Sequence, residues 1–155
     1  MIQRIQTLYL LIATILTGSL FFLTMAEMAG SDALYELTWR GVYEVEPDGA
    51  KELMVPGWAL AILTVLTTAL SLVSIFLYKK RMVQIRICAL NLGLLLGLSA
   101  MIYYMGRTGA NEMDATDLSF NWPLVLPLVA MILVYLALRA IGKDEALVKS
   151  MNRIR

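Results

Sequence analysis

The sequence predicts an all-α membrane protein: a four-transmembrane-helix bundle with a small extracytoplasmic β-hairpin cap. Of its 155 residues, 59% are hydrophobic and 16% are charged, whereas a soluble domain carries roughly a quarter of charged residues. Four long runs lack charge almost entirely, and the charged residues gather in the segments between them. We therefore expect a single domain over residues 1–155, with helices packed against one another in lipid.

The four runs are long enough to cross a bilayer, because a helix rises about 1.5 Å per residue and the hydrocarbon layer is about 30 Å thick. The predicted spans are residues 7–26, 58–77, 87–105 and 123–141. The first run has the alternative of a cleavable signal peptide. It exceeds the usual apolar region of roughly 7–15 residues and no clean A-x-A site precedes the polar loop, so we expect a retained span.

Residues 27–57 form an acidic outer loop with the pattern of a β-hairpin. Residues 35–46 alternate between apolar and polar side chains, which predicts one half-buried strand. Pro47, Asp48 and Gly49 predict a turn, and residues 51–55 return as a second strand. An isolated hairpin is marginal in water, so its apolar face must rest on the helix ends or on a partner. The residues of this candidate partner-facing strand are Tyr35, Leu37, Trp39 and Tyr43.

The charge distribution predicts the orientation in the membrane. The inner loop, residues 78–86, carries four cations and no acid, and residues 143–155 have the pattern of a short amphipathic helix on the cytoplasmic surface. Counting Arg139, the inner segments carry ten of the thirteen lysines and arginines, and the outer loops, 27–57 and 106–122, carry ten of the twelve acids. By the positive-inside rule, the protein is a multi-pass inner (cytoplasmic) membrane protein with both termini in the cytoplasm.

The third run carries a candidate helix-packing face and one polar side chain at depth. Ala89, Gly93 and Gly97 are spaced four residues apart, and small residues at this spacing let two helix backbones approach closely. The partner is another helix of the same bundle, a second copy of the chain, or a partner helix. Asn91 is expected to form an interhelical hydrogen bond, with a ligand site as the alternative.

Composition argues against an enzyme. The chain has no histidine, its predicted span interiors hold no ionisable acid or base that would activate a nucleophile, and Cys88 is its single cysteine. These absences also argue against a proton-coupled transporter. No residue pattern predicts a metal site, a cofactor or a basic face for nucleic acid.

The leading hypothesis is a non-enzymatic scaffold or accessory subunit of an envelope complex, with a membrane-protein partner or a homo-oligomer. The alternative is a membrane protein that binds or handles a lipid or another hydrophobic small molecule. That alternative rests on the hydroxyl groups of residues 64–74, on a kink at Pro127, and on a candidate anionic-lipid contact. The residues of this contact are Lys79, Lys80, Arg81 and Arg86.

Three stretches resemble the signatures of a known family. They are the opening MIQRIQTLYLL, the connector FLYKKRMVQIRICALN and the closing KDEALVKSMNRIR. Together they are similar to a small family of four-span membrane proteins from Bacteroidetes that is a domain of unknown function. The resemblance covers nearly the whole chain. It implies four helices and an inner-membrane location, and it implies no activity and no catalytic residue.

Overall fold

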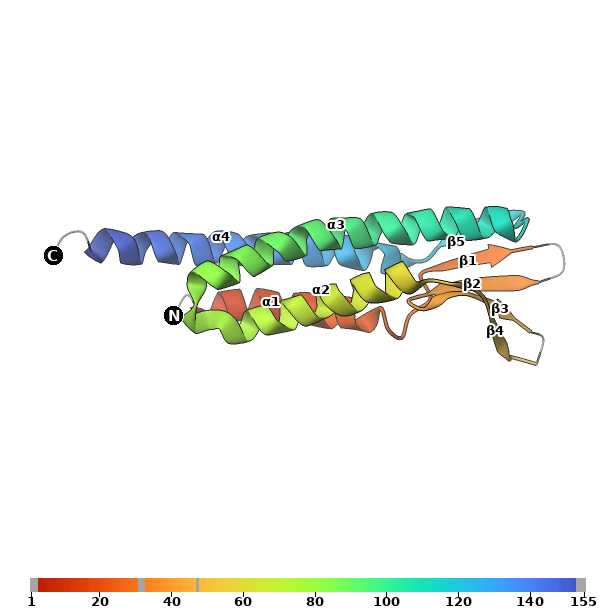
Figure 1. Ribbon diagram of the computed structural model, residues 1–155, viewed down its shortest axis with the longest axis horizontal. Helices are drawn as coiled ribbons and strands as arrows, with labels where there is room; N and C mark the ends of the chain where they lie inside the picture. The colour runs from red at the N-terminus through yellow and green to blue at the C-terminus, as the bar shows by residue number, and fades with distance from the viewer. Residues whose placement is uncertain (1–2, 31–32, 47, 153–155) are drawn as a thin grey trace.

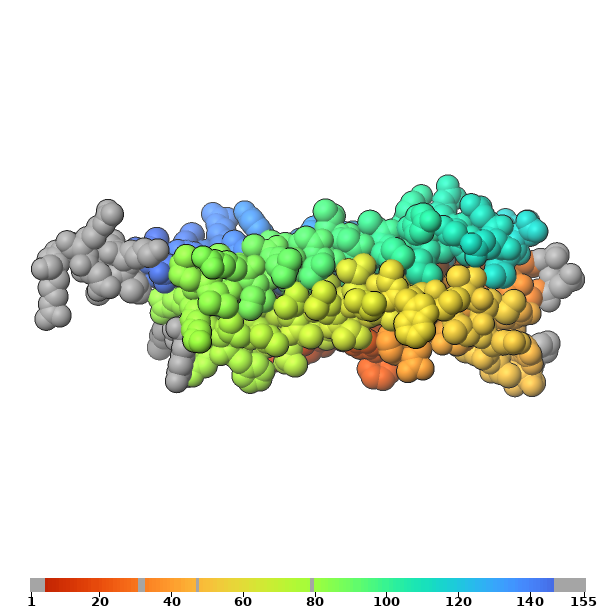
Figure 2. Space-filling view, viewed as in Figure 1, coloured from red at the N-terminus to blue at the C-terminus, as the bar shows by residue number. Residues whose placement is uncertain are grey.

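A computed structural model describes residues 3–30, 33–46 and 48–152. Four helices run side by side and a five-stranded antiparallel sheet continues from one end of them, giving a long rod (Figures 1 and 2). The helices are α1 (Gln3–Ser19), α2 (Trp58–Phe76), α3 (Arg81–Glu112) and α4 (Leu126–Asn152). The strands are β1 (Ala26–Ala29), β2 (Leu34–Thr38), β3 (Gly41–Val45), β4 (Lys51–Pro56) and β5 (Asp117–Phe120), in the order β4-β3-β2-β1-β5.

The predicted fold class, an all-α four-transmembrane-helix bundle with a small hairpin, is wrong. A sheet of five strands forms a second layer at the helix ends, and three of the described helices are long and apolar enough to cross a membrane. These three candidate spans are Trp58–Phe76, Arg81–Glu112 and Trp122–Ala146. The apolar helix Ile5–Ser19 in α1 is shorter than any of them.

The helix of the first predicted span ends at Ser19 and not at residue 26, because a charge-free run is compatible with a turn as well as with a helix. After Ser19 the chain tightens into a turn, in which the amides of Leu20, Phe21 and Phe22 bond carbonyls three residues back. It then enters the sheet, where Met25 donates its amide to the carbonyl of Leu37 at 2.8 Å. Residues 20–25 thus form a charge-free connection between α1 and β1, and they include both buried Met25 and Phe22, which is 90% exposed.

Two further segments continue helices where loops or separate elements were predicted. α3 includes most of the basic connector, residues 81–86, at its start. At its end it includes residues 106–112, which were predicted to belong to the second outer loop. α4 continues past Gly142 to Asn152, in place of a separate surface helix over residues 143–155. A 3₁₀ helix, Trp122–Val125, precedes α4, so Pro127 lies in the first turn of α4, where its missing N–H costs no internal hydrogen bond.

The sheet is joined to the helices through α3, which runs along one face of it (Figure 1). The inward side chains of the strands, including Met28, Leu37 and Val42, are fully buried in a core shared with α2, α3 and the start of α4. Two glycines of α3 allow this close approach, since a Cβ on Gly106 would lie 2.6 Å from the Phe120 ring and one on Gly109 would lie 3.1 Å from Val42. A second core lies between the four helices.

Candidate functional site

A groove opens on the outer face of the sheet where the sheet meets the helices. We call it the Trp39 groove, and its volume is about 550 Å³. Three segments form it: the connection that follows α1, the turn between β2 and β3, and the faces of β3 and β4. Its lining residues are Phe21, Phe22, Leu23, Thr24, Thr38, Trp39, Arg40, Tyr43 and Lys51.

The turn that carries Trp39 and Arg40 is a tight hairpin whose backbone requires glycine. Thr38 pairs with Gly41 across the turn, and the Thr38 hydroxyl accepts a hydrogen bond from the Arg40 amide. Gly41 has φ +144°, and a Cβ there would overlap the carbonyl oxygen of Val55 and lie 2.7 Å from the amide nitrogen of Gly57. Because no other residue adopts this φ readily, Gly41 determines where the turn lies.

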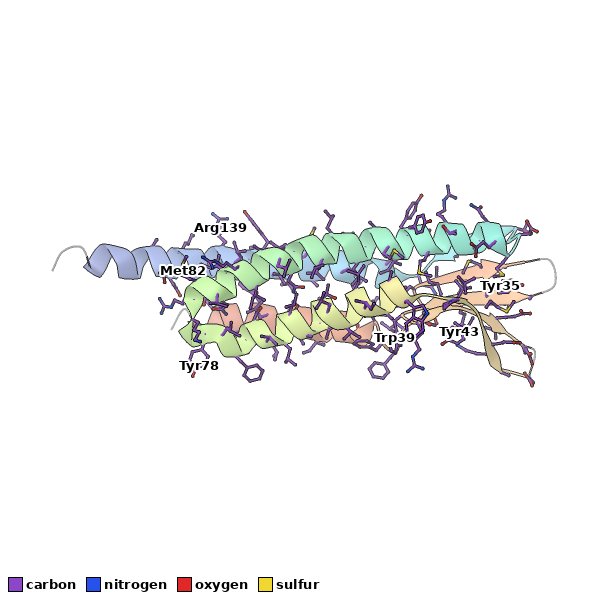
Figure 3. All side chains as sticks on the ribbon, in the orientation of Figure 1. Tyr35, Trp39, Tyr43, Tyr78, Met82 and Arg139 are labelled. Atoms are coloured by element: carbon purple, nitrogen blue, oxygen red, sulfur yellow. The ribbon has the colours of Figure 1, made fainter. Side chains whose placement is uncertain are left out.

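The same turn is hydrogen-bonded to the residue that precedes a candidate span. The amide of Gly57, the N-cap of α2, donates to the carbonyl of Arg40 at 2.7 Å. Trp58 follows and is 76% exposed. Figure 3 places Trp39 at this junction of helices and sheet. Arg40 therefore lies at the level where α2 begins.

Arg40, one of the two cations that line the groove, contacts the ring of Trp39, which in turn contacts Phe21. The rings of Phe21 and Trp39 meet edge to face with centroids 5.0 Å apart, and the guanidinium carbon of Arg40 lies 4.7 Å from the centroid of the Trp39 ring. Among the described residues, no carboxylate lies within ion-pair distance of Arg40. Lys51, by contrast, pairs with Glu36, which also accepts a hydrogen bond from the Thr24 hydroxyl.

The predicted partner-facing strand is two strands with a turn between them, and three of its four residues, Tyr35, Leu37 and Trp39, pack against the protein's own core. Leu37 is fully buried and Tyr35 packs against the same core, so neither presents a face to a partner. The hairpin at Trp39 and Arg40 reverses the chain, and Tyr43 lies opposite Glu36 on the outer face. Val42, which broke the predicted alternation, pairs with Leu37 and is buried. That exception, together with Gly41, was the signal for the turn.

The predicted helix-packing face points away from the other helices. Ala89, Gly93 and Gly97 are all exposed, and a Cβ built on either glycine meets nothing within 4 Å. These residues therefore do not pack within this chain. A second copy or a partner helix stays the open alternative for this face.

The predicted anionic-lipid contact lies at the opposite end of the rod from the Trp39 groove. The connector folds as a 3₁₀ helix, Leu77–Lys79, followed by the first turns of α3. Lys80 and Arg86 are exposed and Arg81 is half-buried, whereas the side chain of Lys79 lies outside the part that the structure describes. Figure 3 shows Tyr78, Met82 and Arg139 gathered at this end.

The polar groups between the helices bond to one another or to the helix backbone. Asn91 donates to the Ser71 hydroxyl at 2.8 Å, which is the predicted interhelical hydrogen bond, and Gln84 donates to the carbonyl of Ser74 at 2.9 Å. The hydroxyls of Thr64 and Thr67 donate to carbonyls one turn back. At the basic end, Gln6 donates to Asp144 and so joins α1 to α4. The hydroxyl groups predicted in residues 64–74 are thus part of the packing between the helices.

The remaining observations concern the thiol of Cys88 and the side chains that bind metal ions. Cys88 is fully buried in the core between the helices. Within the described ranges, no three histidine, cysteine, aspartate or glutamate side chains gather in a group that could hold a metal ion.

Asn91 Oδ1 is the one buried side-chain oxygen or nitrogen without a hydrogen-bond partner in the part of the chain that the structure describes.

A model of the family described as "Domain of unknown function (DUF4293)" matches residues 2–154. The match covers nearly the whole chain, so the chain belongs to this family, as the three signature stretches predicted. No curated protein matches the sequence.

Proposed function

We propose that this member of the DUF4293 family is an inner-membrane protein that holds its sheet outside the cytoplasm and serves as a non-enzymatic scaffold or accessory subunit. Three helices long and apolar enough to cross a membrane support the membrane location. Exposed Trp58 and Trp122 begin the two chain segments that leave the sheet, and tryptophans are enriched at membrane–water interfaces. The cations of the connector lie at the other end, which by the positive-inside rule is cytoplasmic.

An apolar patch on the outer face of the sheet supports the scaffold role. The register pairs Leu34 with Val45 and Tyr43 with Leu53, so all four side chains lie on the face opposite the buried core. Leu34 is 60% exposed and Leu53 is 46% exposed. We call these four residues the sheet patch. Apolar side chains that gather on a water-facing surface are typical of a protein-binding site, whereas scattered single ones need no explanation.

The edge of the sheet formed by β4 is a less suitable docking element than the patch. β4 has an irregular register opposite Val42 and Tyr43, which leaves Met54 without a direct partner. The strand also carries exposed Lys51 and Glu52 and ends at Pro56. Bulges, charges and proline on an edge strand discourage pairing with another strand. We therefore assign the partner to the face of the sheet and not to its edge.

The test is native expression followed by purification in mild detergent. We expect the wild-type protein to migrate in a native gel as a complex larger than the monomer, and Leu34→Glu combined with Leu53→Glu to migrate as the monomer. Ser119→Glu is the matched control, because Ser119 is exposed on the same face at the other edge of the sheet. Differently tagged copies will separate a homo-oligomer from a complex with another protein. A wild-type monomer, or a double variant that keeps its complex, contradicts the proposal.

A further inference from the structure

The Trp39 groove combines an unpaired cation with aromatic walls at the level where the chain enters its candidate spans. We propose that it binds a phospholipid with an anionic headgroup, taken from the leaflet next to the sheet. The inference rests on the proposed membrane location but not on the sheet patch. It concerns the end of the rod opposite the basic connector.

Charge complementarity favours an anionic ligand. Lys51 and Glu36 form an ion pair on the groove face. Arg40 remains as the uncompensated charge of the groove among the described residues. A guanidinium presents two parallel N–H groups to a phosphate. The Trp39 ring already fixes its position, so less side-chain entropy is lost when the phosphate binds.

The walls favour a ligand with an apolar part. Phe21 and Phe22 enter the groove from the end of α1, and Phe22 is 90% exposed. In the proposed orientation the end of α1 lies at the membrane interface, because exposed Trp58 begins α2 at the same end of the helices (Figure 1) and tryptophans are enriched at that interface. A phospholipid satisfies both features, with its acyl chains along the phenylalanines and its phosphate at Arg40. A free phosphate ion uses only Arg40.

Quenching of Trp39 fluorescence tests the proposal directly. Trp58→Phe and Trp122→Phe leave Trp39 as the single tryptophan. The protein is reconstituted in nanodiscs of phosphatidylcholine, with a minor fraction of either phosphatidylglycerol or phosphatidylcholine that carries bromine near the ester end of its acyl chains. We expect brominated phosphatidylglycerol to quench Trp39 at about one tenth of the mole fraction that brominated phosphatidylcholine needs, which corresponds to one charge-assisted hydrogen bond.

A matched pair of variants separates a site from general surface attraction. Arg40→Gln should abolish the preference for phosphatidylglycerol, whereas Arg107→Gln should leave it unchanged, because Arg107 is an exposed cation on α3 outside the groove. Size-exclusion profiles and the emission maximum of Trp39 check that both variants are folded.

Three results would overturn the proposal. They are equal quenching by the two lipids, equal loss of the preference in both variants, and loss of the preference on addition of millimolar inorganic phosphate. The last result would identify a soluble anion as the occupant. Because the protein is already in a bilayer, none of these results bears on its membrane location. None of the substituted residues is Leu34 or Leu53, so the scaffold proposal is tested separately.

Discussion

The two ends of the rod both carry cations, but they hold them in different ways. At the basic end, Lys80, Arg81 and Arg86 follow one another along the first turns of α3. At the sheet end, the guanidinium of Arg40 makes a cation–π contact with the ring of Trp39. A backbone hydrogen bond connects the turn that carries Arg40 to the start of α2. The first arrangement depends on the number of charges, because any cation near a membrane surface contributes similarly. The second depends on the position of a single side chain.

The difference teaches that the largest cluster of charge is not the most specific site. A cluster of exposed lysines and arginines orients a protein and attracts anionic surfaces without selecting a ligand. A guanidinium held in one geometry beside an apolar groove can discriminate between headgroups. Three sets of variants test this contrast, and the expected effect decreases from the first to the last.

The largest effect is expected from removing the charge of the basic end. Replacing Lys79, Lys80, Arg81 and Arg86 by glutamine should give a mixture of orientations, because in the proposed orientation these cations keep their end of the helices in the cytoplasm. Reporter fusions at the C-terminus measure the fraction in each orientation. Neutralising Arg40, Lys51 and Arg107 at the sheet end is the control, and it should leave the orientation uniform. Uniform orientation in the first variant would mean that the terminal segments carry the signal.

The next effect concerns the geometry of the sheet end. Gly41→Ala should destabilise the protein by about 2–4 kcal/mol, because alanine rarely adopts the Gly41 φ and its Cβ would meet backbone atoms of Val55 and Gly57. Thermal unfolding in detergent, followed by circular dichroism, measures the loss. Gly49→Ala is the control, since Gly49 also has positive φ, +85°, but its Cβ would meet nothing within 4 Å. We expect a loss of about 1 kcal/mol there.

A second control for the same experiment comes from the basic end. Gly142 lies inside α4, and a Cβ there would meet nothing within 4 Å. Gly142→Ala should therefore leave the stability unchanged or raise it by up to about 1 kcal/mol, through the better helix propensity of alanine. Equal losses in all three glycine variants would contradict the view that the turn at Trp39 is the tightly determined part of the molecule.

The sequence predicts the helices better than the sheet for a physical reason. The second span begins at Trp58 as predicted, because a proline and a glycine precede a charge-free run, and α2 ends within a residue of the predicted boundary. The hairpin of β3 and β4 was likewise predicted from local turn residues. Pairing between β1 and β5 joins segments about ninety residues apart in sequence. The alternation of residues 118–122 is typical of a strand, but a local pattern does not indicate which strand it pairs with.

The sequence pattern does not predict the Trp39 groove. The alternation of residues 35–46 predicts one strand with Trp39 in its middle, whereas the structure has two strands with Trp39 and Arg40 in the turn between them. Val42 on the polar face and Gly41 beside it were the local evidence for a turn. The contact of Arg40 with Trp39 follows from that turn. Phe21 lines the groove because α1 ends at Ser19. The charge-free run of residues 7–26 gives no sign of that helix end.

The smallest effect is expected at Lys51, the second cation of the groove. Its ion pair with Glu36 is partly exposed, with side-chain exposures of 47% and 23%. Exposed pairs typically contribute about 0–1 kcal/mol. Lys51→Met should therefore lower the unfolding free energy by no more than that, and the loss should disappear in high salt, where charges are screened.

The same variant tests the division of roles between the two groove cations. Lys51→Met leaves the charge of Glu36 uncompensated on the groove face, so the quenching preference for phosphatidylglycerol should weaken without disappearing. Lys51→Met combined with Glu36→Gln removes both charges of the pair, and the preference should return to the wild-type level. If the double variant also loses the preference, Lys51 itself contacts the anion, and the site depends on two cations and not on the position of Arg40 alone.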